Sequence, residues 1–168
     1  MLRELHVELG IPVDYDLDGM RPTFEEAAEL VDVGCNLVGR MQRLTPDTAV
    51  SWQNMQAAAQ EDEIKLMIVS GFRSVEYQAD LIRKKINAGQ SVSEILSVNA
   101  APGFSEHHTG CAIDIASPGS RPLTEEFELS DAYRWLKKNA ANFGFSMTYP
   151  RENKLGFIFE PWHWAKFG

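Results

Sequence analysis

The stretch from Ser105 to Asp114, with the sequence SEHHTGCAID, constrains the fold more than any other part of this chain. It carries two potential metal ligands, His107 and Asp114, with Gly110 between them. A neutral imidazole and a carboxylate both bind Zn²⁺ well, and catalytic zinc usually takes three protein ligands and leaves a fourth position open. Gly110 permits a backbone conformation that a side chain would obstruct. We therefore expect His107 and Asp114 to converge on one zinc ion.

The third ligand has to come from elsewhere, and the sequence Glu160-Pro161-Trp162-His163 offers His163. Glu160 suits general base work, because zinc lowers the pKa of bound water to about 7 and a nearby carboxylate can take its proton. The same group can then pass the proton to a leaving amine. Pro161 lacks a backbone donor and indicates the end of a strand. We predict that Glu160 is the proton shuttle and not a fourth ligand.

Arg73 is the candidate cation of the site. Its guanidinium could hold a substrate carboxylate through two hydrogen bonds, or stabilise the oxyanion that develops on a carbonyl, and the sequence leaves both roles open. Gln78 and Ser105 could orient a substrate through neutral hydrogen bonds. A surface amide and a loop hydroxyl are the plain alternatives for these two residues.

The remaining histidines and cysteines have simpler interpretations. We read His6 and His108 as structural or surface residues, since neighbours in an extended segment point to opposite sides and His107 takes the metal. Cys111 is interpreted as a small packed residue, and Cys35 and Cys111 lack a CxxC spacing, so both are expected to be thiols. A structural zinc site commonly uses four ligands, often cysteines, which this chain does not offer.

The composition of the chain limits the kinds of binding partner and the cellular compartment that we expect for it. The chain has 168 residues, enough for one domain with a sizeable core, and a formal net charge of −8. That charge argues against nucleic acid or an anionic membrane as the partner. There is no apolar run of about 20 residues, and the charged N-terminus lacks the apolar region of a signal peptide, so we expect a cytoplasmic protein. Its oligomeric state is left open.

The predicted elements make an α+β chain with helices packed on a small antiparallel sheet. Residues 1–22 are expected to be an irregular lead-in with a short strand, residues 23–30 a helix behind a Thr23–Glu26 capping box, and residues 31–44 a loop with one strand. Caps and apolar spacing predict further helices at residues 46–61, 75–88, 92–98 and 131–143. Strands are predicted at residues 64–69, 111–115, 145–149 and 157–160, the last two forming a hairpin.

Several separate motifs, in the same order, resemble the VanY-type D-alanyl-D-alanine carboxypeptidases. The family pattern is S-x-H-x-x-G-x-A-x-D followed by a late E-x-W-H. Here the matching segments are SGFRS at 70–74, PGFSEH at 102–107, GCAID at 110–114 and EPWH at 160–163. The similarity covers roughly residues 45–168 and leaves 1–44 as an N-terminal extension of the single domain, 1–168.

The resemblance implies a DD-carboxypeptidase/hedgehog-like zinc peptidase fold and removal of D-alanine from peptidoglycan stem peptides. It implies zinc ligands at His107, Asp114 and His163. It also implies a base at Glu160 and substrate contacts from Arg73, Gln78 and Ser105. Cys111 stands where a larger aliphatic residue is common, which alters packing more than chemistry.

Members of this family cut different bonds. A cytoplasmic D,D-carboxypeptidase would attack the cell's own pentapeptide precursors, whereas an L,D-carboxypeptidase would convert recycled tetrapeptides to reusable tripeptides. From the expected compartment we predict the L,D reaction on a stem peptide or muropeptide. A D,D-carboxypeptidase or dipeptidase, a phage-type endopeptidase and a non-catalytic zinc-binding interaction domain remain as alternatives, although a purely structural site has no use for Glu160.

Overall fold

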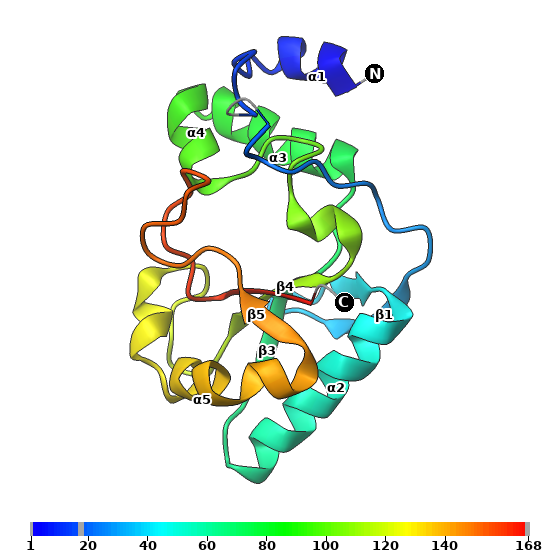
Figure 1. Ribbon diagram of the computed structural model, residues 1–168, viewed down its shortest axis with the longest axis vertical. Coiled ribbons are helices and arrows are strands. Elements are labelled where there is room, and N and C mark those ends of the chain that lie inside the picture. The colour runs from blue at the N-terminus through cyan, green and yellow to red at the C-terminus, as the bar shows by residue number, and fades with distance from the viewer. Residues whose placement is uncertain (1, 17–18, 167–168) are drawn as a thin grey trace.

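A four-stranded antiparallel sheet lies at the centre of the protein, in the strand order β3-β4-β6-β5. The computed structural model describes residues 2–16 and 19–166 (Figure 1). The central strands are β3 (Met67–Ser70), β4 (Ala112–Ala116), β5 (Phe145–Met147) and β6 (His163–Lys166). A separate hairpin joins β1 (Val31–Cys35) to β2 (Met41–Leu44). The helices are α1 (Leu2–Glu8), α2 (Pro46–Glu61), α3 (Val75–Asn87), α4 (Val92–Val98) and α5 (Asp131–Asn139), with 3₁₀ turns η1 (Glu106–Thr109), η2 (Glu125–Leu129) and η3 (Ala140–Phe143).

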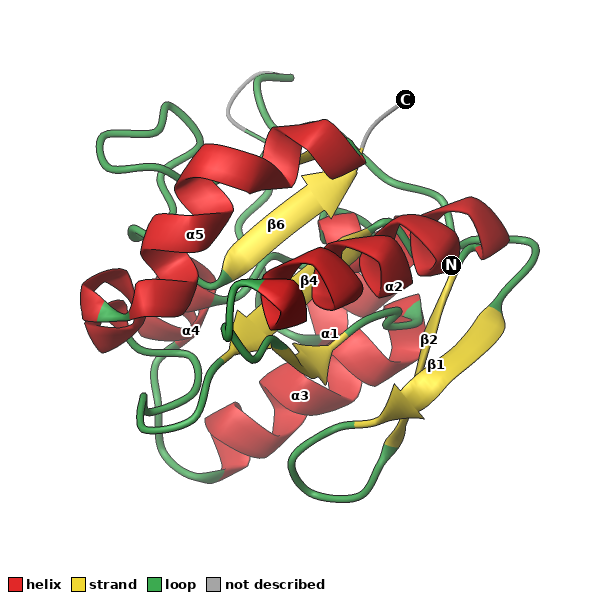
Figure 2. Ribbon diagram, turned by 90° about the horizontal axis from the view of Figure 1, so that it is seen from below, coloured by secondary structure: helices red, strands yellow, loops and turns green. Residues whose placement is uncertain are grey.

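The central sheet separates two groups of helices, and the predicted α+β class with a small antiparallel sheet is confirmed. Helices α2 and α5 cover one face, and α1, α3 and α4 lie beyond the other (Figures 1 and 2). Ile113 and Ile115 of β4 and Trp164 of β6 pack into the core under α2 and α5. Because side chains alternate along a strand, Asp114 and His163 must face the opposite side, toward α3 and α4. The sheet thus carries its polar pair on one face and a dry core on the other.

A second hydrophobic cluster lies among α3, α4 and the N-terminal part of the chain. Leu9, Ile11 and Tyr15 pack there against side chains that include Ile82 and Ile95. Residues before the first strand therefore form part of the core around α3 and α4. Among the described residues, no helix is both long and apolar enough to cross a bilayer.

The helices with clear caps form where the sequence predicts them. Thr45 caps α2, with Pro46 at the first helical position, and Ser74 caps α3. Ser91 and Glu94 form a reciprocal capping box at the start of α4. These caps need only neighbouring residues, which explains why they could be read from the sequence.

Two predictions for the N-terminal region are wrong. The expected irregular lead-in contains a helix, α1, although residues 1, 17 and 18 lie outside the described residues. The helix expected behind Thr23 does not form. The Glu26 carboxylate instead accepts a hydrogen bond from the backbone N–H of Val75, at the start of α3. The N–H of Ala27, which would make the first hydrogen bond of a helix capped by Thr23, donates instead to the carbonyl of His108, and the N–H of Phe24 donates to that of Gly103.

Strand boundaries also differ from the prediction. The region expected to be a loop with one strand, residues 31–44, is the β1–β2 hairpin, with a bulge between Asp32 and Gly34. The strand expected at residues 157–160 is absent, and β5 pairs with β6 instead. The N–H of Ile158 donates to Ser97 and that of Glu160 to Tyr149, so this segment bonds to two different partners and joins no ladder. The first predicted strand is shorter than expected and forms at β3.

Candidate metal centre and active site

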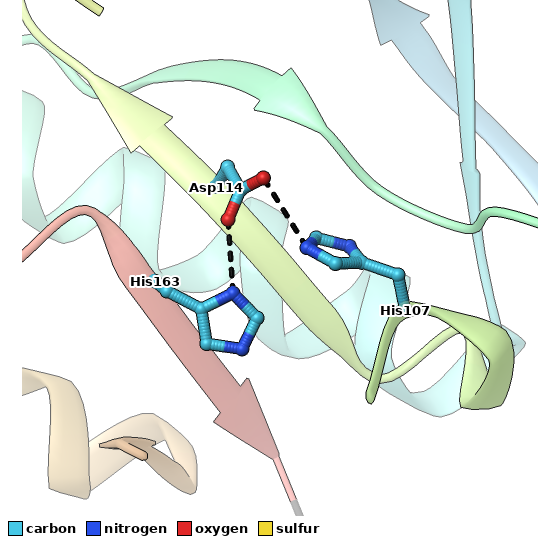
Figure 3. Close-up of side chains that lie close together, drawn as sticks. All are labelled: His107, Asp114 and His163. Atoms are coloured by element: carbon cyan, nitrogen blue, oxygen red, sulfur yellow. Dashed lines mark hydrogen bonds and ion pairs between the residues drawn. The ribbon is translucent and has the colours of Figure 1, made fainter. Parts of the chain in front are cut away.

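Three potential metal ligands from two strands and a 3₁₀ turn meet on the polar face of the sheet (Figure 3). Strands β4 and β6 place Asp114 directly opposite His163, and the His163 Nδ1 lies 2.9 Å from Asp114 Oδ1. Turn η1 brings the Nε2 of His107 to 3.2 Å from Asp114 Oδ2. All three residues are buried, and one ligand atom from each lies within 4.8 Å of the others.

Two glycines make the approach of these segments possible. Gly110 ends η1 with φ of 66°, and a Cβ there would lie 2.9 Å from the Leu30 side chain. At Gly71, after β3, a Cβ would lie 2.7 Å from the carbonyl oxygen of Arg43, which is backbone and cannot rotate away. The carbonyl of Gly71 accepts a hydrogen bond from His107 Nδ1 at 2.7 Å. Gly110 thus adopts a positive φ, as expected, and His107 and Asp114 lie close together.

The donor set fits a metal ion. The Nε2 of His107 is buried and makes no hydrogen bond within the described residues, despite its ion-pair distance from Asp114. Two imidazoles and a carboxylate are a ligand set that zinc commonly takes, and their ligand atoms lie within 4.8 Å of one another. The second ring nitrogen of each histidine has an acceptor, as is usual for metal-binding histidines: Gly71 for His107 and Glu106 for His163.

The two histidines have opposite electrostatic environments. Burial and the nearby Arg73 charge lower the pKa of His107 to about 4, which keeps its ring neutral. Burial also disfavours a charged His163, but hydrogen bonds to Asp114 and Glu106 outweigh it and raise the pKa to about 10. Burial opposes ionisation of Asp114 too, yet the adjacent histidines and Arg73 hold its pKa well below the usual range. The cluster thus combines a neutral imidazole at His107, a carboxylate at Asp114 and a ring at His163 that readily carries a proton.

Glu160 lies beside this cluster in a small cavity. The cavity has a volume of about 30 Å³ and is also lined by His107, His163, Tyr149 and Phe157. Burial, and secondarily the nearby Asp114 charge, raise the pKa of Glu160 to about 7 even though the positive charges of His163 and Arg73 oppose the shift. No hydrogen bond within the described residues involves its carboxylate. A buried carboxylate with a pKa near neutrality, next to space for water, is suited to proton transfer.

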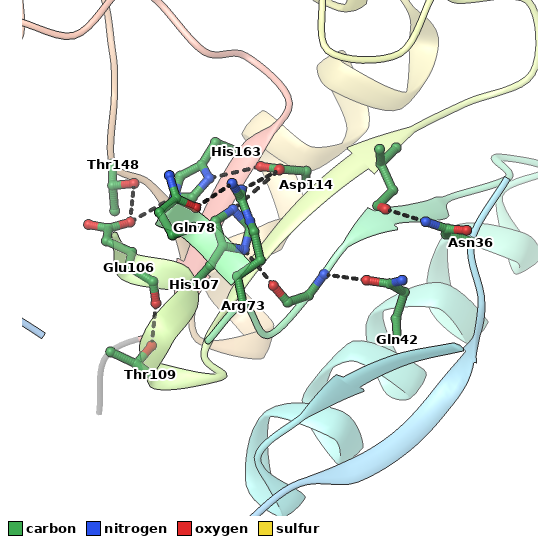
Figure 4. Close-up of polar contacts among 12 residues, drawn as sticks. Asn36, Gln42, Arg73, Gln78, Glu106, His107, Thr109, Asp114, Thr148 and His163 are labelled. Atoms are coloured by element: carbon green, nitrogen blue, oxygen red, sulfur yellow. Dashed lines mark hydrogen bonds and ion pairs between the residues drawn. The ribbon is translucent and has the colours of Figure 1, made fainter. Parts of the chain in front are cut away.

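The predicted polar residues Arg73, Gln78 and Ser105 line the same cavity. Arg73 donates to Asp114 Oδ2 at 3.1 Å and to the Gln78 side-chain oxygen at 3.2 Å (Figure 4). The buried Nε of Arg73 has no partner within the described residues, so one donor is left over. Gln78 also donates to the carbonyl of Ala100 at 2.8 Å. The oxygen and the nitrogen of the Gln78 side-chain amide are thus both hydrogen-bonded. Gln78 therefore holds Arg73 and this part of the cavity wall in place.

The residues interpreted as structural have structural partners. The His108 ring is fully buried; its Nδ1 lies 2.6 Å from the Arg73 carbonyl, and its Nε2 accepts from the N–H of Gly103. His6 lies 2.7 Å from the carbonyl of Pro102. Both cysteines are free thiols, and Cys111 is half-buried with its Sγ 3.7 Å from the Thr45 hydroxyl. His108 and Cys111 stand outside the ligand cluster, as expected.

Two residues of the site were not predicted. Glu106 contacts His163 on the side away from Asp114, and Tyr149 packs against the His163 ring with 4.8 Å between ring centroids. Burial and neighbouring carboxylates raise the pKa of Tyr149, which keeps its hydroxyl protonated. Glu106 directly precedes the predicted ligand His107, and this position was the sequence feature that could have indicated a role at the site. Tyr149 falls in the stretch from Phe143 to Pro150 that the family resemblance includes, but no role was predicted for it. Its approach to His163 depends on the pairing of β5 with β6 just before it.

A more spacious cavity lies apart from this cluster. It has a volume of about 650 Å³ and is lined mainly by residues 63–65, 117–120 and 129–132. Its wall holds acidic and hydroxyl groups and one lysine, but neither a histidine nor a cysteine. Size alone would favour it as a binding site, but the convergent ligands and the shifted pKa values lie in the smaller cavity.

Comparison with known proteins agrees with this geometry. A D-alanyl-D-alanine carboxypeptidase from Enterococcus faecalis is 32% identical over 126 residues, which cover 69% of this chain and 45% of the relative. The solved structure of the LD-carboxypeptidase LdcB is 29% identical with a TM-score of 0.76, and the match covers 88% of this chain and 72% of that one. A variant of the vancomycin-resistance D,D-pentapeptidase VanY, solved with Zn(II), is 28% identical with a TM-score of 0.63, covering 83% and 79% of the two chains.

The chain spans about half the length of the curated relatives it matches. The family model described as VanY, D-alanyl-D-alanine carboxypeptidase, matches residues 41–168 and so includes every member of the buried ligand cluster. This chain belongs to the VanY family of D-alanyl-D-alanine carboxypeptidases.

Proposed function

We propose that this chain is a zinc-dependent carboxypeptidase that releases C-terminal D-alanine from peptidoglycan stem peptides. The observation that carries the proposal is the buried cluster of His107, Asp114 and His163 beside Glu160, whose pKa is raised to about 7. Membership of the VanY family supports the same reaction. The zinc bound to a VanY structure supports zinc as the ion that the three ligands hold here.

The protein's own groups divide the work of hydrolysis. Bound at this site, zinc would supply Lewis acidity that polarises a carbonyl and activates water near neutral pH. Glu160 takes the proton from the attacking water and returns it to the nitrogen of the leaving D-alanine. Arg73 offers its unpaired Nε–H to the terminal carboxylate or to the developing oxyanion, while Gln78 and Asp114 fix its guanidinium. Ser105, on the cavity wall, is proposed as a further hydrogen-bonding group for the peptide.

Within this class we propose the L,D reaction, in which a tetrapeptide stem loses its D-alanine to give a tripeptide. The similarity in fold to the LD-carboxypeptidase LdcB over most of this chain supports it. The second candidate is D,D-carboxypeptidase activity on stems ending in D-Ala-D-Ala, which the enterococcal relative and VanY favour. Both reactions use the same catalytic groups and differ in the residue that precedes the cut bond.

Product analysis separates these reactions. Zinc-loaded protein is incubated with muropeptides carrying tri-, tetra- or pentapeptide stems, with cross-linked dimers and with free D-Ala-D-Ala, and products are identified by mass spectrometry. We expect tetrapeptide to become tripeptide, with Glu160→Ala as the inactive control. Loss of D-alanine from pentapeptide alone would reassign the enzyme to the D,D class. Cleavage of dimers would indicate an endopeptidase, and no turnover of any substrate would contradict the proposed function.

The negatively charged chain is proposed to bind neither nucleic acid nor membranes, and its cytoplasmic location stays a prediction. Immunodetection of the full-length protein in fractionated cells checks the location. Enrichment outside the cytoplasm would remove the recycling argument for the L,D reaction without affecting the proposed chemistry.

A further inference from the structure

The contact between Glu106 and His163 is as close as any contact among the ligands themselves. The Glu106 Oε2 lies 2.8 Å from His163 Nε2, and the Thr148 hydroxyl donates to the same oxygen at 2.7 Å (Figure 4). Glu106 is buried, with 7% of its surface exposed. A buried carboxylate that accepts two hydrogen bonds has a fixed position, and it fixes the groups that donate to it.

This contact determines which nitrogen of His163 faces the ligand cluster. A neutral imidazole carries one N–H, and the nitrogen without it is free to bind a metal. Both ring nitrogens of His163 face a carboxylate oxygen, Nε2 that of Glu106 and Nδ1 that of Asp114. When a metal takes Nδ1, the Glu106 carboxylate, which accepts, would keep the proton on Nε2. Nδ1 is the atom that lies 2.9 Å from Asp114 Oδ1.

His107 is held in the opposite way. Its Nδ1 lies 2.7 Å from the carbonyl of Gly71, which likewise can only accept, and its Nε2 is the atom left near Asp114. The two histidines therefore present different nitrogens to the cluster. A backbone carbonyl sets the orientation of one ring, and a side-chain carboxylate sets that of the other.

Glu106 lies outside both roles already proposed for acidic residues here. Its carboxylate contacts the Nε2 of His163 and not the Nδ1 that faces Asp114, so the ring stands between Glu106 and the cluster. It does not line the catalytic cavity, whereas Glu160 does. The two carboxylates next to His163 thus have separate environments.

We infer that Glu106 is a positioning residue for the metal centre, which fixes the tautomer and orientation of His163 with Thr148 as its support. The inference rests on the ligand set proposed above. Partners of this kind typically contribute 10- to 100-fold to metal affinity. Glu106 adds to that affinity because it makes the imidazole a stronger electron donor and holds the ring in its binding orientation.

Zinc affinity tests this role without reference to turnover. The zinc dissociation constant of the full chain is measured by competition with a chromogenic chelator for Glu106→Ala, Glu106→Gln and Thr148→Val. Glu25→Gln is the matched control, since Glu25 is exposed and the change removes the same charge. We expect about 10- to 100-fold weaker binding for Glu106→Ala, a smaller loss for Glu106→Gln, a still smaller one for Thr148→Val and no change for the control.

The outcomes separate this inference from the ligand set. His163→Ala is measured in parallel, and full-affinity zinc binding by that variant would refute the ligand set itself. If His163→Ala loses zinc while Glu106→Ala and Glu106→Gln bind it within twofold of the control, Glu106 has no positioning role. Should Glu106→Ala not fold, the isosteric Glu106→Gln decides alone. The absorption spectrum of the cobalt-substituted protein gives a second readout, and an unchanged spectrum with unchanged affinity would contradict the inference.

Discussion

At the scale of single residues, burial sets the chemistry of Glu160. It raises the pKa of this carboxyl from an ordinary 4.5 to about 7, so the basic form appears only as the pH rises through that range. A bound dication would favour the carboxylate and lower the value again. We expect kcat/KM, measured with zinc held saturating, to fall on the acidic side with a midpoint between 4.5 and about 7. A profile that stays flat from pH 4 to pH 8 would show that Glu160 is not the base.

Arg73 offers a second prediction at this scale. Replacing it by lysine keeps the charge but removes the planar group that reaches Gln78 and Asp114 together and presents the spare Nε–H. We expect kcat/KM to fall by about 10²–10³-fold, the loss typical for an oxyanion donor. Zinc affinity, measured on the same samples, should change far less. Arg121→Lys is the control, because Arg121 is exposed and should tolerate the change.

At the scale of elements, the N-terminal segment, meaning residues 2–16 and 19–30, helps to shape the active-site cavity. The Tyr15 hydroxyl accepts from the N–H of Ala101 at 2.9 Å. Arg21 lies over the rings of Tyr15 and Phe157 and donates to the carbonyl of Leu155. Ala100 and Phe157 line the cavity, so this segment braces two of its walls from outside. The extension that the family resemblance left uncovered is therefore joined to the site.

Tyr15→Phe tests that bracing. The substitution leaves the buried N–H of Ala101 without a partner, which typically costs about 1–3 kcal/mol, so we expect the free energy of unfolding to fall by that amount. Tyr133→Phe is the matched control, because no hydrogen bond of the Tyr133 hydroxyl occurs in the described structure. Urea denaturation of both variants measures the difference. Equal stabilities would mean that the Tyr15 contact does not hold the segment in place.

The elements also show where reading a sequence succeeds. Thr45, Ser74 and Ser91 cap their helices through contacts within three residues, and these helices were predicted. The pair Thr23 and Glu26 has the same spacing but forms no helix, since Glu26 contacts Val75 instead. A capping signal is local, whereas the competing partner lies 49 residues away in the chain. The spacing of Thr23 and Glu26 in the sequence therefore cannot tell whether Glu26 caps a local helix or contacts a distant segment.

At the scale of the whole molecule, zinc should stabilise the fold because its ligands come from distant segments. The pairing of β4 with β6 brings Asp114 against His163, although 49 residues of chain separate them. A ligand that binds only the folded state stabilises it by about 2.7 kcal/mol at 100 times its dissociation constant. For a chain of this size that corresponds to a rise in Tm of about 5–10 °C. Differential scanning calorimetry of chelated and zinc-loaded protein checks this, and His163→Ala should show no zinc-dependent shift.

The amino-acid sequence was enough to predict the chemistry available to this protein: the types and order of the proposed ligands, the proposed base and cation, and the family motifs. The glycine at position 110 was also readable as a residue that permits a backbone conformation which a side chain would obstruct, and its φ is 66°. Only the tertiary structure decided that β6 begins at His163, that Glu106 stands behind this ring, and that the N-terminal segment braces the cavity. The reason is physical. Each of these depends on which distant partner satisfies a buried polar group, and that choice is made by the packing of the whole chain.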